Sequence, residues 1–181
     1  LFHEKMPDEY LDKVFSTISR TPHHTYQILT KREERLQDYF GSRPVPQNVW
    51  LGVSVENRKT LHRIDFLRDI PAKIKFLSLE PLLEDLGRVD FNAIHWVIVG
   101  GESGAKARPM VGGESGAKAR PMKKEWAISI KSQCEEQNVS FFFKQWGTWG
   151  ADGVRRSKKA NGRLLMGQEW NEEPAFAMAS N

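Results

Sequence analysis

The chain has 181 residues, a formal net charge of +4 and an isoelectric point of about 9.2. Hydrophobic residues make up 39% and charged residues 28%, which is typical of a globular domain and excludes a mostly disordered chain. The apolar runs are too short to span a bilayer, and the N-terminus lacks the basic start and apolar middle of a secretory signal. We therefore expect a soluble, cytoplasmic protein with no membrane partner.

The single cysteine, Cys134, excludes a disulfide framework and any iron–sulfur or zinc site built from several thiolates of this chain. We interpret it as a small buried residue on a helix. The mildly basic charge permits contact with nucleic acid or an anionic ligand and demonstrates neither.

Five short segments rich in branched and aromatic residues predict buried strands. Apolar residues at three- and four-residue spacing between them predict helices. The strands cover residues 25–30, 49–55, 74–79, 96–99 and 139–143. The helical stripes are Leu11, Val14, Phe15 and Ile18, then Leu61, Ile64 and Leu67, then Trp126, Ile130 and Cys134, with a short charged helix over 32–40.

The first four strand centres lie 24, 24 and 21 residues apart, which predicts strand–helix units in a parallel sheet with right-handed crossovers. An open doubly wound sheet and a (β/α) barrel both fit. We favour the barrel because every strand leads into a similar polar endpoint. The predicted fold is therefore α/β: a partial (β/α) barrel over residues 1–150 and a C-terminal extension over 151–181, with a small hairpin at Gly162–Trp170.

Residues 99–110, VGGESGAKARPM, are followed at once by an identical copy, residues 111–122. Structural repeats diverge and usually run about 20–50 residues, so a solenoid is excluded and a recent duplication or an artefact is indicated. Only one copy can continue the preceding strand, and we expect the other to form a surface loop. The chain also begins in what reads as a strand-to-helix loop, from which we expect a fragment of a longer protein.

Polar residues follow the predicted strands, and the carboxyl ends of parallel strands converge where ligands bind. This places three carboxylates and two lysines on one rim: Lys31, Glu56, Glu80, Glu102 and Lys144. Such a cluster suits hydroxyl and ammonium groups of a ligand, or a divalent metal. The alternative is that Glu56 and Glu80 only form ion pairs with the two lysines.

The run from Gly100 to Gly104 resembles a loop through which backbone approaches a phosphate or nucleotide, because glycines permit close contact. It matches neither the dinucleotide-binding fingerprint nor the P-loop pattern. A tight strand-to-helix turn explains the glycines equally well.

Five motifs in fixed order carry a family resemblance. They are HTYQILTKR at 24–32, NVWLGVSVE at 48–56, FLSLEPLL at 76–83, WVIVGGESG at 96–104 and FFFKQWG at 141–147. In this order they closely resemble the phage Gp37/Gp68-like family, a domain of unknown function (DUF5131) found in phages and bacteria and described as radical SAM-like. The resemblance covers nearly the whole chain.

The resemblance implies a partial (β/α) barrel preceded by an N-terminal segment with three cysteines. In radical SAM enzymes such cysteines hold a 4Fe–4S cluster that reduces S-adenosylmethionine. The expected cofactors of the full-length family are therefore S-adenosylmethionine and the cluster. This chain lacks those cysteines, so we expect it to bind no cluster and to be inactive alone.

By family position, the resemblance implies that Ser54 and Glu56 contact the ribose and that Gly100, Gly101 and Glu102 approach the adenine or the amino-acid group. Because they recur at strand ends, we take Lys31, Glu80 and Lys144 as the candidates for catalysis on this rim. Glu114 would replace Glu102 if the second copy continued the strand.

Two hypotheses therefore stand for function. The first is the cofactor- and substrate-binding part of a radical SAM-like protein with an unknown substrate. The alternative is a phage-derived nucleic-acid-binding module without catalysis, based on the isoelectric point, the basic residues within 155–159 and the exposed tryptophans expected to stack bases. An unpaired sheet edge would also favour self-association.

Overall fold

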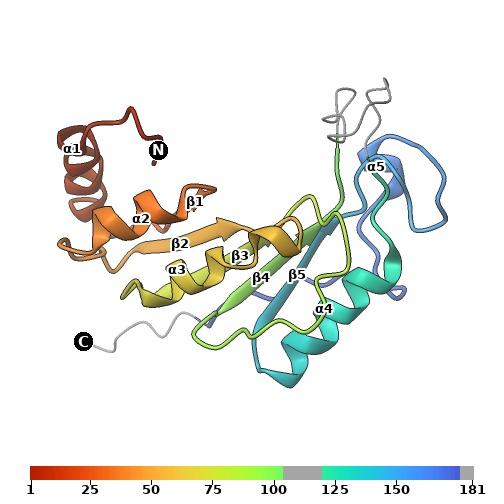
Figure 1. The fold of residues 1–181 in the computed structure, drawn as a ribbon. Helices are drawn as coiled ribbons and strands as arrows, with labels where there is room; N and C mark the ends of the chain where they lie inside the picture. The colour runs from red at the N-terminus through yellow and green to blue at the C-terminus, as the bar shows by residue number, and fades with distance from the viewer. Residues whose placement is uncertain (104–119, 176–181) are drawn as a thin grey trace.

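The structure, a computed structural model, describes residues 1–103 and 120–175. Within these residues, five strands form one sheet in which each pairs in parallel with the next along the chain (Figure 1). Each predicted strand matches an observed one to within two residues, so the α/β fold with parallel strands is confirmed. The strands are β1 (Tyr26–Thr30), β2 (Val49–Ser54), β3 (Ile74–Leu79), β4 (Trp96–Gly100) and β5 (Ser140–Gln145).

The predicted helical stripes also correspond to helices. α1 follows Pro7 and buries Leu11, Phe15 and Ile18. In the described part of the chain, no helix is long and apolar enough to cross a membrane. The helices are α1 (Asp8–Ser19), α2 (Glu33–Phe40), α3 (Arg63–Asp69), α4 (Lys124–Glu136) and the short α5 (Lys158–Asn161), with a 3-10 turn, η1 (Arg58–Thr60).

The larger helices pack against only one face of the sheet. Because side chains alternate along a strand, Leu51 and Val53 of β2 point into the main core, which also contains buried residues of α1 to α4. Trp50, which directly precedes Leu51, points to the other face. There it joins Ile74, Phe76 and Trp96 in a separate cluster that contains no helix residue.

The sheet does not close on itself. β1 and β5 stand at opposite ends of the strand order, so the predicted partial barrel is not confirmed. The outer edge of β5 pairs with a C-terminal segment: the Phe143 N–H donates to the Trp170 carbonyl at 2.9 Å, and Phe142 forms an antiparallel bridge with Asn171. Within the predicted hairpin, Leu165 and Gln168 form a second such bridge.

β1 has one strand neighbour, β2, among the described residues, and Leu29 of β1 is exposed. An unpaired parallel edge is a site at which another strand can add. Self-association through this edge stays a prediction.

The connection between β3 and β4 contains no helix, although the even strand spacing suggests one. Residues 80–95 run as irregular chain that buries Leu82, Leu86, Val89 and Phe91 in the main core. This segment covers part of the sheet as a helix would, but its backbone has no helical hydrogen bonds. Its polar groups therefore need other partners.

Two glutamines supply them, Gln133 on α4 and Gln137, the residue that caps the C-terminus of α4. Gln133 accepts from the Val89 N–H at 2.8 Å and donates to the Gly87 carbonyl at 2.9 Å. One helical turn later, Gln137 accepts from the Phe91 N–H at 2.8 Å and donates to the Val89 carbonyl at 3.0 Å. Side chains four residues apart on a helix lie on one face, which lets the pair bind consecutive peptide groups.

We predict that Gln133→Leu lowers the free energy of unfolding by about 1–3 kcal/mol, because it leaves the buried Val89 N–H and the partly buried Gly87 carbonyl without partners. Urea unfolding measures this change. Gln47→Leu is the control, since Gln47 is exposed and surface changes usually stay within about 0.5 kcal/mol. Equal stability of Gln133→Leu and the parent chain would contradict this role.

Candidate functional site

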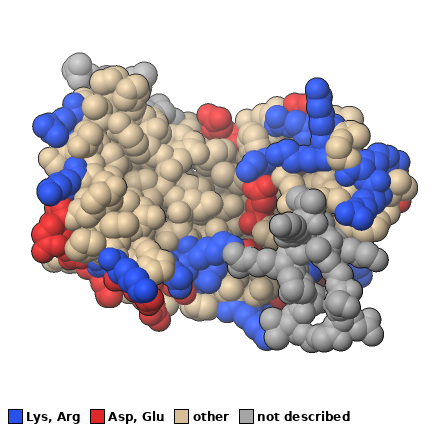
Figure 2. Space-filling model, turned by 90° about the horizontal axis from the view of Figure 1, so that it is seen from above, with Lys and Arg blue, Asp and Glu red and all other residues tan. Residues whose placement is uncertain are grey.

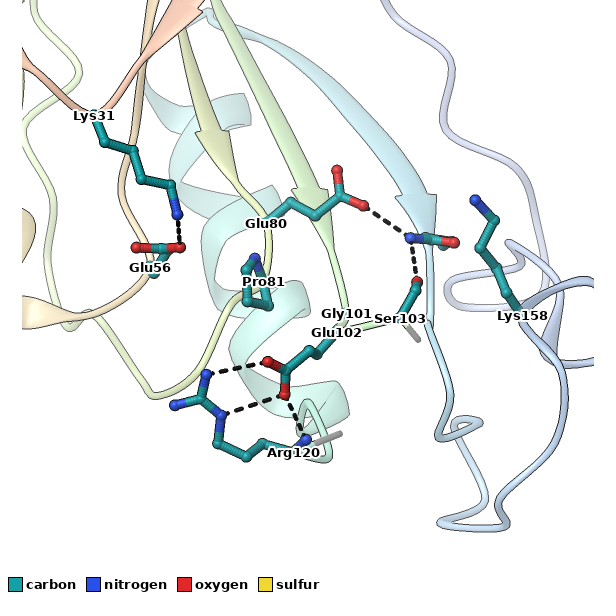
Figure 3. Close-up of a pocket in the computed structure, with 10 residues that line it drawn as sticks. Lys31, Glu56, Glu80, Pro81, Gly101, Glu102, Ser103, Arg120 and Lys158 are labelled. Carbon is teal, nitrogen blue, oxygen red and sulfur yellow. Dashed lines mark hydrogen bonds and ion pairs between the residues drawn. The ribbon is translucent and has the colours of Figure 1, made fainter. Parts of the chain in front are cut away.

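A hollow of about 390 Å³ lies at the carboxyl edge of the sheet (Figure 3). The end of every strand contributes to it, because parallel strands all finish at this edge. Of the residues predicted from the sequence, Lys31, Glu56, Glu80, Gly101 and Glu102 line it. Pro81, Ser103, Arg120, Gln145 and Lys158 complete the lining.

Each of the three carboxylates is paired with a cation. Lys31 pairs with Glu56, and the Lys144 ammonium donates to Glu80 at 2.8 Å. The third pair is Arg120 with Glu102, at 3.2 Å. The ion pairs considered as the alternative reading therefore exist, but pairs that stay partly exposed contribute only about 0–1 kcal/mol each. A charged group of a ligand can therefore replace one partner of such a pair at a small cost in free energy.

Glu80 is also held by a side chain that the sequence analysis missed. The Gln145 amide donates to Glu80 and to the Ser103 hydroxyl, both at 2.8 Å. Gln145 is only 5% exposed, and no hydrogen-bond partner is found for its Oε1. The site therefore contains a buried acceptor that the described residues do not satisfy.

Gly100, at the end of β4, and Gly101, directly after it, permit close packing. A Cβ on Gly101 would lie 1.9 Å from the Trp146 carbonyl oxygen, and one on Gly100 would lie 3.1 Å from the side chain of Glu80. The Gly101 N–H donates to the Gln145 carbonyl at 2.9 Å, which continues the β4–β5 pairing beyond the ladder. The glycines thus let Glu80 lie across β4 and bring Glu102 to the edge of the hollow.

Three of the predicted site residues lie outside this lining. Ser54 is buried and pairs in register with Ser78. Gly100 lies directly against the side chain of Glu80. Lys144 contacts the site through its ion pair with Glu80. The structure therefore brings the rim carboxylates together but does not bring Ser54 to the hollow.

The first copy of the duplicated segment continues β4. Val99 and Gly100 lie in the strand and Glu102 lines the hollow, whereas Glu114 lies outside the described residues. The second copy contributes Arg120, whose backbone N–H and guanidinium both donate to Glu102, at 2.7 and 3.2 Å. These hydrogen bonds, drawn in Figure 3, connect one copy to the other.

A second hollow, of about 350 Å³, lies on the sheet face that the helices leave uncovered. The Trp96 ring forms edge-to-face contacts there with Phe142 and Trp50, each with ring centroids 5.9 Å apart. Glu80 lines both hollows, so an aromatic surface adjoins the charged rim. The lining comprises Gln27, Leu29, Phe76, Ser78, Glu80, Trp96, Ile98, Phe142 and Lys144.

Metal-binding side chains are not grouped in the described ranges: no three His, Cys, Asp or Glu residues converge there. Cys134 is fully buried on α4, and burial raises the pKa of its thiol to about 12. A thiol with that pKa stays protonated near neutral pH and is a poor metal ligand.

A model of a protein family described as "Protein of unknown function (DUF5131)" matches residues 1–111 and 110–174. The chain belongs to the DUF5131 family. The two matched segments meet inside the duplicated stretch. Comparison with curated proteins and with solved structures gives no match. The family resemblance is confirmed, and the family description assigns no activity.

We predict that removing one 12-residue copy keeps the fold and raises its stability by about 1 kcal/mol. Deleting 99–110 or 111–122 yields the same polypeptide and removes 12 of the 17 residues between Glu102 and Arg120. A shorter connection lowers the entropy cost of bringing its ends together. Thermal and urea unfolding of both chains measure the difference, and clear destabilisation by the deletion would contradict this prediction.

Proposed function

We propose that the hollow at the carboxyl edge binds S-adenosylmethionine and that this chain is the cofactor-binding part of a radical SAM-like protein. The observation that carries the proposal is the adjacency of the two hollows through Glu80. S-adenosylmethionine combines a planar ring, two ribose hydroxyls and a charged amino-acid end. An aromatic surface beside a charged rim suits these groups, and pockets of roughly 300–1,000 Å³ are usual for such ligands.

The proposal gives the rim residues distinct roles. Glu56 accepts hydrogen bonds from the ribose hydroxyls, while Glu80 and Glu102 attract the positively charged sulfonium and ammonium groups. Lys31 and Lys144 hold their carboxylate partners in place through ion pairs.

The same proposal accounts for the one-sided sheet. Strands in chain order with every large helix on one face are the arrangement found in part of a (β/α) barrel, where the helices form the outer ring. The face with Trp50, Phe76 and Trp96 would then be the barrel interior.

A 4Fe–4S cluster does not fit the residues of this chain. Such a cluster is held by several thiolates, whereas the sequence has one cysteine, Cys134, which is buried and protonated. The proposal therefore assigns this chain the binding and orientation of S-adenosylmethionine and derives no reductive step from it.

We predict that the chain binds S-adenosylmethionine in calorimetric titration and that Glu80→Gln weakens binding at least tenfold. A hydrogen bond to a charged group contributes about 1.5–3 kcal/mol, and each 1.4 kcal/mol is a factor of ten. Glu9→Gln, an exposed change on α1, is the control. Lack of binding by the parent chain at millimolar ligand would overturn the proposal.

A test of the reaction class requires a longer family member that carries the three cysteines. After anaerobic reconstitution and reduction, we expect it to cleave S-adenosylmethionine to 5′-deoxyadenosine. A reconstituted protein that binds the ligand without cleaving it would reject the radical class and retain the binding site.

One surface favours nucleic-acid binding as a second candidate. Figure 2 shows Lys and Arg side chains gathered over the part of the chain after β5. Arg155, Lys158 and Lys159 are exposed there, and no ion pair is found for them within the described residues. Unpaired cations on one surface suit phosphates.

For this candidate we predict binding to single-stranded DNA with a log–log salt slope of about −2, as three phosphate contacts produce. Arg155→Ala/Lys159→Ala should reduce the magnitude of the slope by about 1.4. Lys5→Ala/Lys13→Ala removes the same charge near α1, at the opposite end of the molecule (Figure 1), and is the control. Binding that is absent, or that does not change with salt, would reject this candidate.

A further inference from the structure

The buried amide of Gln145 has its orientation fixed by its neighbours. A carboxylate only accepts hydrogen bonds, so the amide NH2 must face Glu80, to which it donates at 2.8 Å. The NH2 group also reaches the Ser103 hydroxyl at 2.8 Å. The carbonyl oxygen Oε1 is consequently the atom left without a partner.

An unsatisfied buried acceptor is unusual and needs an explanation. Leaving such a group unpaired costs about 1–3 kcal/mol, and Gln145 is 95% buried, with 5% of its surface exposed. Because Gln145 lines the hollow, a bound molecule can reach it. The group that satisfies Oε1 must be a hydrogen-bond donor, which excludes a phosphate or carboxylate at this position.

Lys158 differs from the other cations around the hollow. Lys31 and Arg120 are each paired with a carboxylate, whereas no ion pair is found for Lys158 in the described chain. It comes from α5, beyond the end of β5, and Figure 3 shows it across the hollow from Lys31. An unpaired ammonium at the edge of a pocket attracts an anionic group of a ligand.

We propose that Gln145 and Lys158 form a subsite for the amino-acid end of the ligand. Gln145 Oε1 accepts a hydrogen bond from the α-ammonium group, which the neighbouring Glu80 carboxylate also attracts. Lys158 pairs with the α-carboxylate. This assignment rests on the proposed function of the hollow and adds two residues that decide which ligands it accepts: zwitterionic ligands are selected over ligands with an uncharged end.

Two probes separate this subsite from the rest of the site. S-adenosylhomocysteine carries the adenosine group and the amino-acid end, whereas 5′-methylthioadenosine has a methyl group in place of the amino-acid end. We expect the parent chain to bind the first at least tenfold more tightly in calorimetric titration. Lys158→Ala and Gln145→Met should each remove most of this preference while leaving 5′-methylthioadenosine binding unchanged.

Lys13→Ala, which removes an exposed charge from α1, is the control and should not change either affinity. If Gln145→Met does not fold, Lys158→Ala decides the question, because Lys158 is exposed. If the parent chain binds the probes and Lys158→Ala weakens both equally, or weakens neither, the subsite is overturned. The proposed function is retained in that case. If neither probe nor S-adenosylmethionine binds the parent chain, the proposed function is overturned and the subsite with it.

Discussion

Parallel pairing of the strands in chain order is the constraint on which the rest of this structure depends. A chain that enters each new strand from the same end must return along the sheet after every strand, and right-handed crossovers place all the returning segments on one face. All carboxyl ends then meet at one edge. Lys31, Glu56, Glu80 and Glu102 surround a single hollow for this reason, although 71 positions separate the first from the last.

The same constraint leaves the other face without helices. Large aromatic side chains occupy it, and Trp96 contacts rings from the strands on both sides. Glu80 stands where this aromatic face meets the charged rim, and its two oxygens are bound by Lys144 and Gln145. One carboxylate therefore links the two surfaces on which the proposed ligand would lie.

The rim depends on contacts between distant segments. Glu102, near the start of the duplicated stretch, forms a hydrogen bond and an ion pair with Arg120, near its end. Met122, two residues further on, is buried in the main core, and α4 begins at Lys124. Both ends of the duplicated stretch are thus anchored by the fold, which explains how the chain accommodates an identical second copy.

The sequence by itself determined the strands, the helical stripes and the carboxylates of the rim, because alternation along a strand and periodicity along a helix are local properties. It also supported the family resemblance that the family match confirms. Only the tertiary structure decided which residues meet: Gln133 with the β3–β4 connection, Arg120 with Glu102, and Gln145 with Glu80. It also left Ser54 outside the hollow and the sheet open. A local pattern specifies the face on which a side chain lies, whereas its partner depends on where a distant segment packs.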